Sequence, residues 1–285
     1  MNTYRDRAAI VSLRVLFVVP VVVLSLSVFA GRVGAETISL NYRSTDTQNG
    51  NPGDYVLSPT DVAGVVAVDH WNDAQHSNLQ PSFDAFNLMD NNGVGTTADL
   101  TLISSNGAAG PGQGVSGVRS NDNRMLLSPK AIGTNAGPAA PSFTLTLNGA
   151  EIPFAIYDVL VYLTDQRSNA ENTSVEATLG DTTYYLQTPD NDEIFFANSG
   201  FVVSADTVDD GDFNNDVANY VRFAGVTGDS FSIELVATQG NTVSDSSRLG
   251  IGGVQITQAI PEPSTLALAA LGLLGLLGFG RRGRK

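Results

Sequence analysis

The sequence lacks cysteine altogether, and it has only two histidines and one tryptophan among 285 residues. Without cysteine there is no disulfide framework, no thiolate nucleophile and no cysteine-ligated zinc site. His70 and His76 are six positions apart, so they do not share a helix face as the two histidines of a His-x-x-x-His zinc pair do. These absences exclude several kinds of catalytic and structural site.

Basic side chains are scarce in the central part of the chain. Residues 36–260 carry seven Lys and Arg against 27 Asp and Glu, a formal charge of −20. Residues 1–35 and 261–285 each carry four basic side chains and one acidic side chain. Because an acidic body repels polyanions, we expect no nucleic-acid partner.

Helical periodicity is nearly absent between residues 36 and 259. Short alternating runs instead end at Gly, Asn, Asp or Pro, which is the pattern of many short strands joined by turns. The chain is therefore predicted to be all-β, with a jelly-roll-like antiparallel β-sandwich over residues 36–259. The expected strands are Thr37–Tyr42, Ala98–Ile103, Phe143–Leu147, Ala155–Leu163, Ser174–Leu179, Thr182–Gln187, Tyr220–Ala224, Ser230–Ala237 and Gly250–Thr257.

The sequence also supports several local predictions. Within Ala155–Leu163, alternation places the odd-numbered side chains on one face of the strand and the even-numbered ones on the other. Gly180 and Asp181 join two strands, with Gly in first place as a type II′ turn prefers. We expect a short helix within Asp69–Asp90. Ser104–Pro141 is rich in Gly, Ala, Asn, Ser and Pro, and we expect it to be a long loop without strands.

The N-terminus has the composition of a signal peptide, assigned to residues 1–35. Three arginines precede or flank an apolar run, Val15–Phe29, and small residues follow. Cleavage is expected between Ala35 and Glu36, with Ala30 as a second possible site and an uncleaved membrane anchor as the alternative. The expected partners are the Sec translocon and signal peptidase.

The C-terminus has three parts in a fixed order. The motif, residues 260–264, contains Pro261, Glu262 and Pro263. An uncharged apolar run follows over residues 265–280, and residues 281–285 form a basic end. A helix of about 15 apolar residues is about 22 Å long, short for a hydrocarbon core of about 30 Å, but snorkelling arginines make a transmembrane helix feasible.

This tail resembles the PEP-CTERM sorting signal, also known as the ice-binding protein C-terminal domain. The family usually has Val before Pro-Glu-Pro, where this chain has Ile260. The resemblance implies recognition by an exosortase, an integral-membrane cysteine protease, with Pro261, Glu262 and Pro263 as the recognition residues. It does not imply ice binding. An ordinary tail anchor is the alternative.

The central part is similar to a group of exported bacterial β-sandwich proteins of unassigned function that carry the same tail. The likeness supports a carbohydrate-binding-like sandwich and transfers no activity. It rests on the segments Ala63-Gly64-Val65-Val66, Trp71-Asn72, Asn123-Arg124-Met125, Ile152 to Tyr162, Asn219 to Phe223 and Gly252 to Ile256.

The densest acidic run lies between residues 206 and 216. Closely spaced carboxylate and amide oxygens around a Gly are the ligands that calcium prefers, although the order does not match an EF-hand. Asp209, Asp210, Asp212 and Asp216 are the candidate ligands, with a solvated acidic loop as the alternative. No other cofactor is expected.

Candidate catalytic side chains carry little specific signal. His70 is interpreted as a loop histidine packed against Trp71, and Asp158, Asp165 or Glu234 as acids of a possible hydrolase. The aromatic residues Tyr157, Tyr162, Tyr184, Tyr185, Tyr220 and Trp71 can either stack on sugars or fill the core, and alternation places Tyr184 and Tyr185 on opposite faces.

The sequence thus predicts an exported protein that is held transiently in the inner membrane and then delivered to the cell envelope, cell surface or medium. Its expected role is that of a non-enzymatic structural or polysaccharide-binding module. The alternative is an exported hydrolase for glycosides or esters, with its site in the acidic loops.

Overall fold

The named elements in the described part of this computed structural model are all β-strands. The structure describes residues 35–44, 57–76, 82–104, 109–110, 131–134, 142–164, 173–189, 199–211, 215–238 and 248–260. In these residues the strands are β1 (Thr37–Ser44), β2 (Asn72–His76), β3 (Ser82–Ala85), β4 (Asp99–Ser104), β5 (Ala109–Gly110), β6 (Ala131–Thr134), β7 (Ser142–Ala150), β8 (Ile156–Thr164), β9 (Thr173–Leu179), β10 (Thr182–Thr188), β11 (Val203–Ser204), β12 (Tyr220–Thr227), β13 (Phe231–Thr238) and β14 (Arg248–Gln258).

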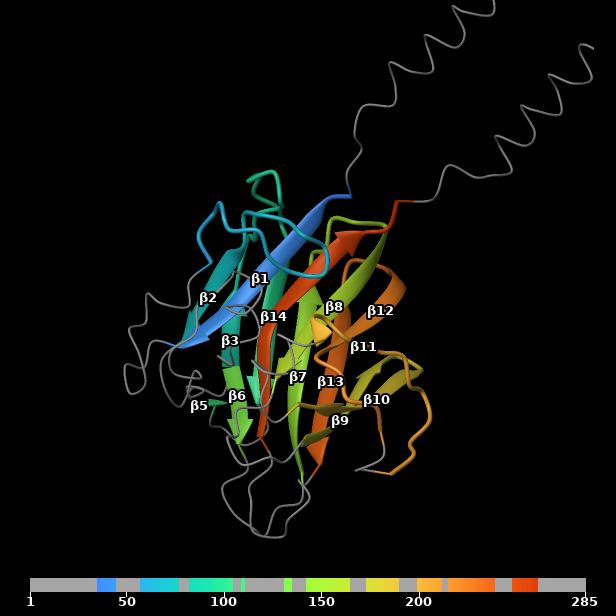
Figure 1. Cartoon of the computed structure of the whole chain (residues 1–285). Coiled ribbons are helices and arrows are strands. Elements are labelled where there is room, and N and C mark those ends of the chain that lie inside the picture. Colours follow the sequence, from blue (N-terminus) through green and yellow to red (C-terminus); the bar gives the residue numbers. More distant parts are fainter. Residues whose placement is uncertain are drawn as a thin grey trace, which may run out of the picture. The chain divides into compact units, whose positions relative to one another are not determined.

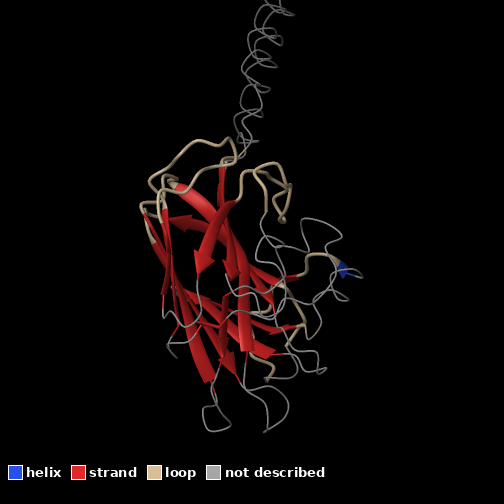
Figure 2. Cartoon of the chain, turned by 90° about the vertical axis from the view of Figure 1, so that its left-hand side faces the viewer, coloured by secondary structure: helices blue, strands red, loops and turns tan. Residues whose placement is uncertain are grey.

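The strands form two sheets packed face to face (Figures 1 and 2). Sheet 1 has the order β11-β12-β8-β14-β1-β2, and it also includes β6, which pairs with β14, and β5, which pairs with β6. Sheet 2 has the order β10-β9-β13-β7-β4-β3. The pairs β1/β2 and β11/β12 are parallel, and the other strand pairs are antiparallel. The predicted β-sandwich is confirmed.

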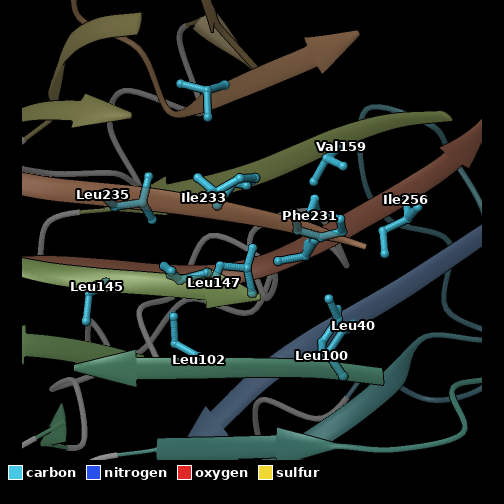
Figure 3. Close-up of a cluster of buried hydrophobic side chains, with 14 of the residues drawn as sticks. Leu40, Leu100, Leu102, Leu145, Leu147, Val159, Phe231, Ile233, Leu235 and Ile256 are labelled. Carbon is cyan, nitrogen blue, oxygen red and sulfur yellow. The ribbon is translucent and has the colours of Figure 1, made fainter. Parts of the chain in front are cut away.

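Alternating side chains from both sheets build the main core between them. In β8 the odd-numbered side chains from Tyr157 to Leu163 all point into this core, as predicted from their alternation. Leu145 and Leu147 of β7 face them together with Ile233 of β13 (Figure 3). Each fully buried aliphatic or aromatic side chain contributes about 1.5–3 kcal/mol, so this layer supplies most of the stabilisation.

All nine predicted strands are present, several of them longer than expected. The turn between β9 and β10 also agrees with its prediction. Gly180 has a φ of +57°, while Asp181 does not have a positive φ. A type I′ turn needs positive φ at both positions, so the turn is of type II′.

In the described residues 69–76 and 82–90 the predicted helix is wrong, because β2 and β3 lie there instead. Asn and Asp have low intrinsic strand preference, but β2 pairs in parallel with β1, and Asn72 donates through Nδ2 to the Ser39 carbonyl at 2.9 Å. The loop over residues 104–141 was also predicted to lack strands, yet β5 and β6 lie within it and extend sheet 1 through β14. These strands form because a long-range partner is available, which local composition does not reveal.

Candidate functional site

Both junctions that matter for export lie at the same end of the sandwich. Thr37, the first residue of β1, pairs with Thr257 near the end of β14. The Gln258 amide donates to the Glu36 carbonyl at 2.8 Å, and the Ala259 amide donates to the Ile156 carbonyl at 2.9 Å. The predicted signal-cleavage site at Ala35 and Glu36 therefore directly precedes one central strand, and the predicted sorting motif directly follows its neighbour.

A turn over residues 63–68 covers the outer face of sheet 1. The Val65 amide donates to the Tyr162 hydroxyl at 2.7 Å, and that hydroxyl donates to Oε1 of Gln255. The Gln255 Nε2 donates to the Val66 carbonyl at 2.8 Å and to Ser39 Oγ at 3.1 Å. Burial raises the pKa of the Tyr162 hydroxyl. The turn is thus fixed to sheet 1 by buried hydrogen bonds with paired donors and acceptors.

Gly64 permits this close approach. Its φ is +96°, and a Cβ at this position would lie 2.5 Å from Gln255 Oε1. Gln255 was not predicted as important, although the segments that contain Gly64 and Gln255 were both among those that resemble other exported sandwiches. The structure explains why these segments go together, because they contact each other across the sheet.

Most of the aromatic side chains are structural. Trp71, Tyr162 and Tyr220 form a second buried cluster with Leu57, Ala63 and Leu160, and Phe201 packs against it. The Tyr162 ring lies 6.4 Å from Trp71 and 6.0 Å from Tyr220, measured between centroids. These rings fill space on the outer face of sheet 1, so they do not form a sugar-stacking platform.

The remaining tyrosines divide as alternation predicts. Tyr157 is in the main core beside Phe231, and Tyr184 packs against Phe223 at 5.2 Å. Tyr185 is the neighbour of Tyr184 in β10 and pairs with Glu176, so it lies on the opposite, outer face of sheet 2. Of the predicted stacking residues, Tyr185 alone among the described ones is on that outer face.

The outer face of sheet 2 carries polar side chains in register. One row across the sheet is Thr183, Thr178, Glu234, Thr146, Ile103 and Ser82, and the next is Ser232, Asn148, Thr101 and Asp84. Asp84, Ile103, Ser232 and Glu234 are exposed, and the others are half-buried. Thr101 donates to Asp84 at 2.8 Å, and Thr178 and Thr183 share a hydrogen bond of 2.9 Å. These two rows are accessible, although Ser174 and Gln187 on the same face are buried, whereas Leu160 and Tyr162 on the outer face of sheet 1 are covered.

His70 is held in a loop by its neighbours. It has a φ of +56°, its Nδ1 lies 3.0 Å from Asp69 Oδ1, and its ring lies where a Cβ on Gly93 would be in tight contact. The Nδ1–Oδ1 distance is that of an ion pair, although the alignment is not that of a good hydrogen bond. Contact with His70 lowers the pKa of the exposed Asp69 carboxyl. His76 lies in β2, and its side chain is outside the described residues.

The two described acids proposed for hydrolysis lie on opposite sides of the sandwich. Asp158 is on the outer face of sheet 1, where it forms an ion pair with Arg222 and accepts the Gly225 amide at 2.9 Å. Glu234 is exposed on the outer face of sheet 2. They therefore cannot act as a catalytic pair on one glycosidic bond, which needs two carboxyl groups within about 10 Å. Asp165 lies outside the described residues.

The acidic run is described in part, since Asp212 is outside the described residues. Asp209 Oδ1 accepts the Gly211 amide at 2.9 Å, and Asn215 Oδ1 accepts the Asp210 amide at 3.1 Å. Asp216 is exposed. Within the described ranges, no group of three or more His, Asp or Glu side chains is arranged to hold a metal ion. Calcium binding by Asp209, Asp210, Asp212 and Asp216 stays a prediction.

The calcium prediction has a direct test by metal removal. Since ligand binding to the native state stabilises it, chelation with EDTA is expected to lower the melting temperature of the domain, and added calcium to restore it. The Asp209→Asn and Asp216→Asn double variant is expected to melt at the chelated temperature with or without calcium. A melting temperature of the unmodified domain that EDTA does not change contradicts the site.

Comparison with protein families identifies the C-terminal segment. Residues 259–285 match the family model described as the PEP-CTERM protein-sorting motif. The chain carries a PEP-CTERM sorting signal. Pro261, Glu262 and Pro263 lie within the match, which makes the protein an exported one that an exosortase processes and sorts to the cell surface.

The sorting signal itself begins where the described sandwich ends. Pro261, Glu262, Pro263 and the apolar run over residues 265–280 are outside the described residues. In the part of the chain that the structure does describe, no helix has the length and apolar character needed to cross a membrane.

Comparisons with other proteins add little. No curated protein matches this chain. Among solved structures, one described as "Structural analysis of an exo-beta-agarase" is 15% identical over 47% of this chain and 22% of that chain, with a TM-score of 0.17. The matched part is less than a quarter of that protein, and the TM-score is too low to support a shared fold or activity.

Proposed function

We propose that the mature domain is a non-enzymatic surface module that binds extended polysaccharide on the outer face of sheet 2. The observation that carries this proposal is the contrast between the two outer faces. The outer face of sheet 1 is covered around Leu160 and Tyr162 by residues 57–71 and by Phe201, while sheet 2 presents hydroxyl, amide and carboxylate groups to solvent. A regular, accessible array of hydrogen-bonding side chains suits a repeating polymer better than a small substrate.

The charge of this face restricts the class of polysaccharide. Asp84, Glu176 and Glu234 lie on it, and none of its described outward side chains is Lys or Arg. Carboxylates bind hydroxyl or ammonium groups by charge-assisted hydrogen bonds and repel anions. We therefore favour a neutral or amino-sugar polymer over an acidic one, with the Tyr185 ring as a place for one sugar to stack.

Affinity electrophoresis tests this proposal. The fragment 36–260 contains every described strand, and its mobility is expected to fall in gels that contain a neutral glucan or partly deacetylated chitin. Glu234→Arg is expected to raise the dissociation constant obtained from the retardation at least about tenfold. This is the effect of losing about 1.4 kcal/mol from one central contact. Asp229→Arg makes the same charge change at an exposed site in the β12–β13 turn and serves as the control.

Two results would contradict the proposal. Equal retardation of the Glu234→Arg and Asp229→Arg variants would remove sheet 2 as the binding face. Hydrolysis of chromogenic glycosides or esters by the same fragment would contradict the non-enzymatic role.

The sandwich is proposed to be a jelly roll. In support, four strands of sheet 1 follow the order β1-β14-β8-β12 and four of sheet 2 the order β7-β13-β9-β10. The chain passes between these two sets as two interleaved Greek keys do. Cross-strand NMR contacts that failed to place β14 between β1 and β8 would contradict this topology.

The tail is proposed to span the inner membrane as a helix over residues 265–280 until processing. The basic end would then remain in the cytoplasm, and Glu262 would be on the outer side. Whether the processed protein is a component of the envelope or of the extracellular matrix follows from where its mature form is found.

A further inference from the structure

An ordered loop between β3 and β4 presents three apolar side chains to solvent. Phe86 is 62% exposed, Met89 41% and Val94 59%, and we call these three residues the apolar tip. The loop is well fixed. Asn72 exchanges two hydrogen bonds with the backbone of Met89, at 2.7 and 2.8 Å, and Asp90 Oδ1 accepts the Val94 amide at 2.9 Å. Three large apolar side chains are therefore held at the surface by one fixed loop.

The apolar tip lies at the end of the sandwich from which the sorting tail leaves. The Asn91 amide donates to the Thr37 carbonyl at 2.8 Å, and the Thr37 amide donates to Asn91 Oδ1 at 2.9 Å. Thr37 pairs in turn with Thr257, so the loop is about two strand spacings, roughly 10 Å, from the end of β14. Figure 1 shows the start of β1 and the end of β14 side by side at this end of the sandwich.

The tail leaves little distance between this end and the membrane. Ala259 is still hydrogen-bonded to Ile156, and the apolar run begins at Thr265. The segment between them reaches at most about 20 Å when fully extended, and Pro261 and Pro263 restrict it further. A headgroup layer takes up about 5–8 Å of this distance on one side of the bilayer. The end of the domain is therefore held at the membrane surface.

Electrostatics does not provide the attraction. Glu36, Asp99, Glu151 and Asp229 flank the strand ends on this side, and they disfavour an anionic surface. The contact expected here is shallow and apolar, and Ile260, which is 40% exposed, adds to it. A surface of this kind suits a zwitterionic lipid interface.

We propose that, in the tail-anchored precursor, the apolar tip rests in the outer headgroup layer of the membrane. This proposal depends on the membrane-spanning tail proposed above. It orients the sandwich with the strand ends of β1 and β14 toward the bilayer, and it places the Pro-Glu-Pro motif in the narrow space between the domain and the membrane. An exosortase then has to reach the motif from the side, beneath a folded domain.

The absence of cysteine allows a direct test with single labels. The precursor, residues 36–285, is reconstituted in phosphatidylcholine vesicles, with a polarity-sensitive fluorophore on Val94→Cys or Phe86→Cys. Ile103→Cys is the matched control, because Ile103 is 41% exposed on β4 but points outward from the face of sheet 2. Leu273→Cys, in the middle of the apolar run, reports on whether the tail is inserted.

The expected result is at least about twofold quenching at positions 86 and 94 by spin-labelled headgroups, and little at position 103. Quenching of the Leu273 probe by chain-labelled lipid with none at position 94 would overturn the loop contact and leave the anchored tail intact. No quenching at Leu273 would overturn both. Quenching at position 94 that appears only with exosortase in the vesicle would replace the lipid contact with docking on the protease.

Discussion

The Glu262→Ala precursor is expected to accumulate in the membrane fraction at full length, ending at Lys285. Glu262 is the one charged side chain between the two prolines of the matched sorting motif, so its loss removes the ionic contact available to the exosortase. Processing should fall at least about tenfold, since a lost charged hydrogen bond costs about 1.5–3 kcal/mol.

Intact-mass spectrometry of envelope and medium measures this effect. The unmodified protein should yield a species that starts near Glu36 and ends around residues 261–263, and this species should be nearly absent for the variant. Ser264→Ala, directly after Pro263, is the control and should be processed normally. A processed species from Glu262→Ala at the normal level would contradict the role of Glu262 in recognition. An unmodified protein that stays in the membrane fraction and ends at Lys285 would make the tail a plain membrane anchor.

The second large effect is expected for Gln255→Ala, which should destabilise the domain by about 3–5 kcal/mol. The Gln255 side chain is fully buried and bonds to Tyr162, Val66 and Ser39. Its removal leaves buried polar groups without partners and creates a cavity under the covering turn. For a domain of this size the melting temperature should fall by about 10 °C or more.

Gln258→Ala provides the control, because Gln258 is in the same strand with a half-buried side chain at its end. It should change the melting temperature by only about a degree, as substitutions of less buried side chains usually do. Thermal unfolding of the two variants of fragment 36–260, monitored by circular dichroism, gives the two melting temperatures to compare. If the two variants melt at the same temperature, the buried network does not hold the covering turn in place.

The outer face of sheet 2 is accessible and that of sheet 1 is covered, and different residues cause this difference. β8 carries apolar side chains on both faces, with Leu160 and Tyr162 on the outer one, whereas β13 carries the polar Ser232 and Glu234 on its outer face. Sheet 1 is covered because Gly64 lets a turn approach Gln255, and because Tyr162 and Trp71 lie under it. The contrast between the two outer faces, on which the proposed binding face rests, therefore depends on contacts between residues almost 200 positions apart.

Alternation and turn residues were sufficient for the strands of the two sheets that carry the core. Gly180, Asp181 and the periodicity of residues 155–163 act locally, through backbone sterics and the two faces of a strand, so the sequence alone predicts their structure correctly. The sorting motif is equally local, since a linear peptide carries it, and residues 260–285 identify it without reference to the fold.

What depends on tertiary contacts could not be predicted in this way. Strand β2 has a loop-like composition and exists because β1 offers it an unpaired edge, which is why a helix was wrongly expected there. The separation of Asp158 from Glu234 on opposite faces, and the burial of Trp71, Tyr162 and Tyr220, follow from how the sheets pack. The sequence by itself determined the nine strands predicted from alternation, the C-terminal sorting signal and the all-β class, because these depend on near neighbours in the chain. The tertiary structure decided which face is accessible and brought the start of β1 beside the end of β14, because both depend on contacts between residues far apart in the chain.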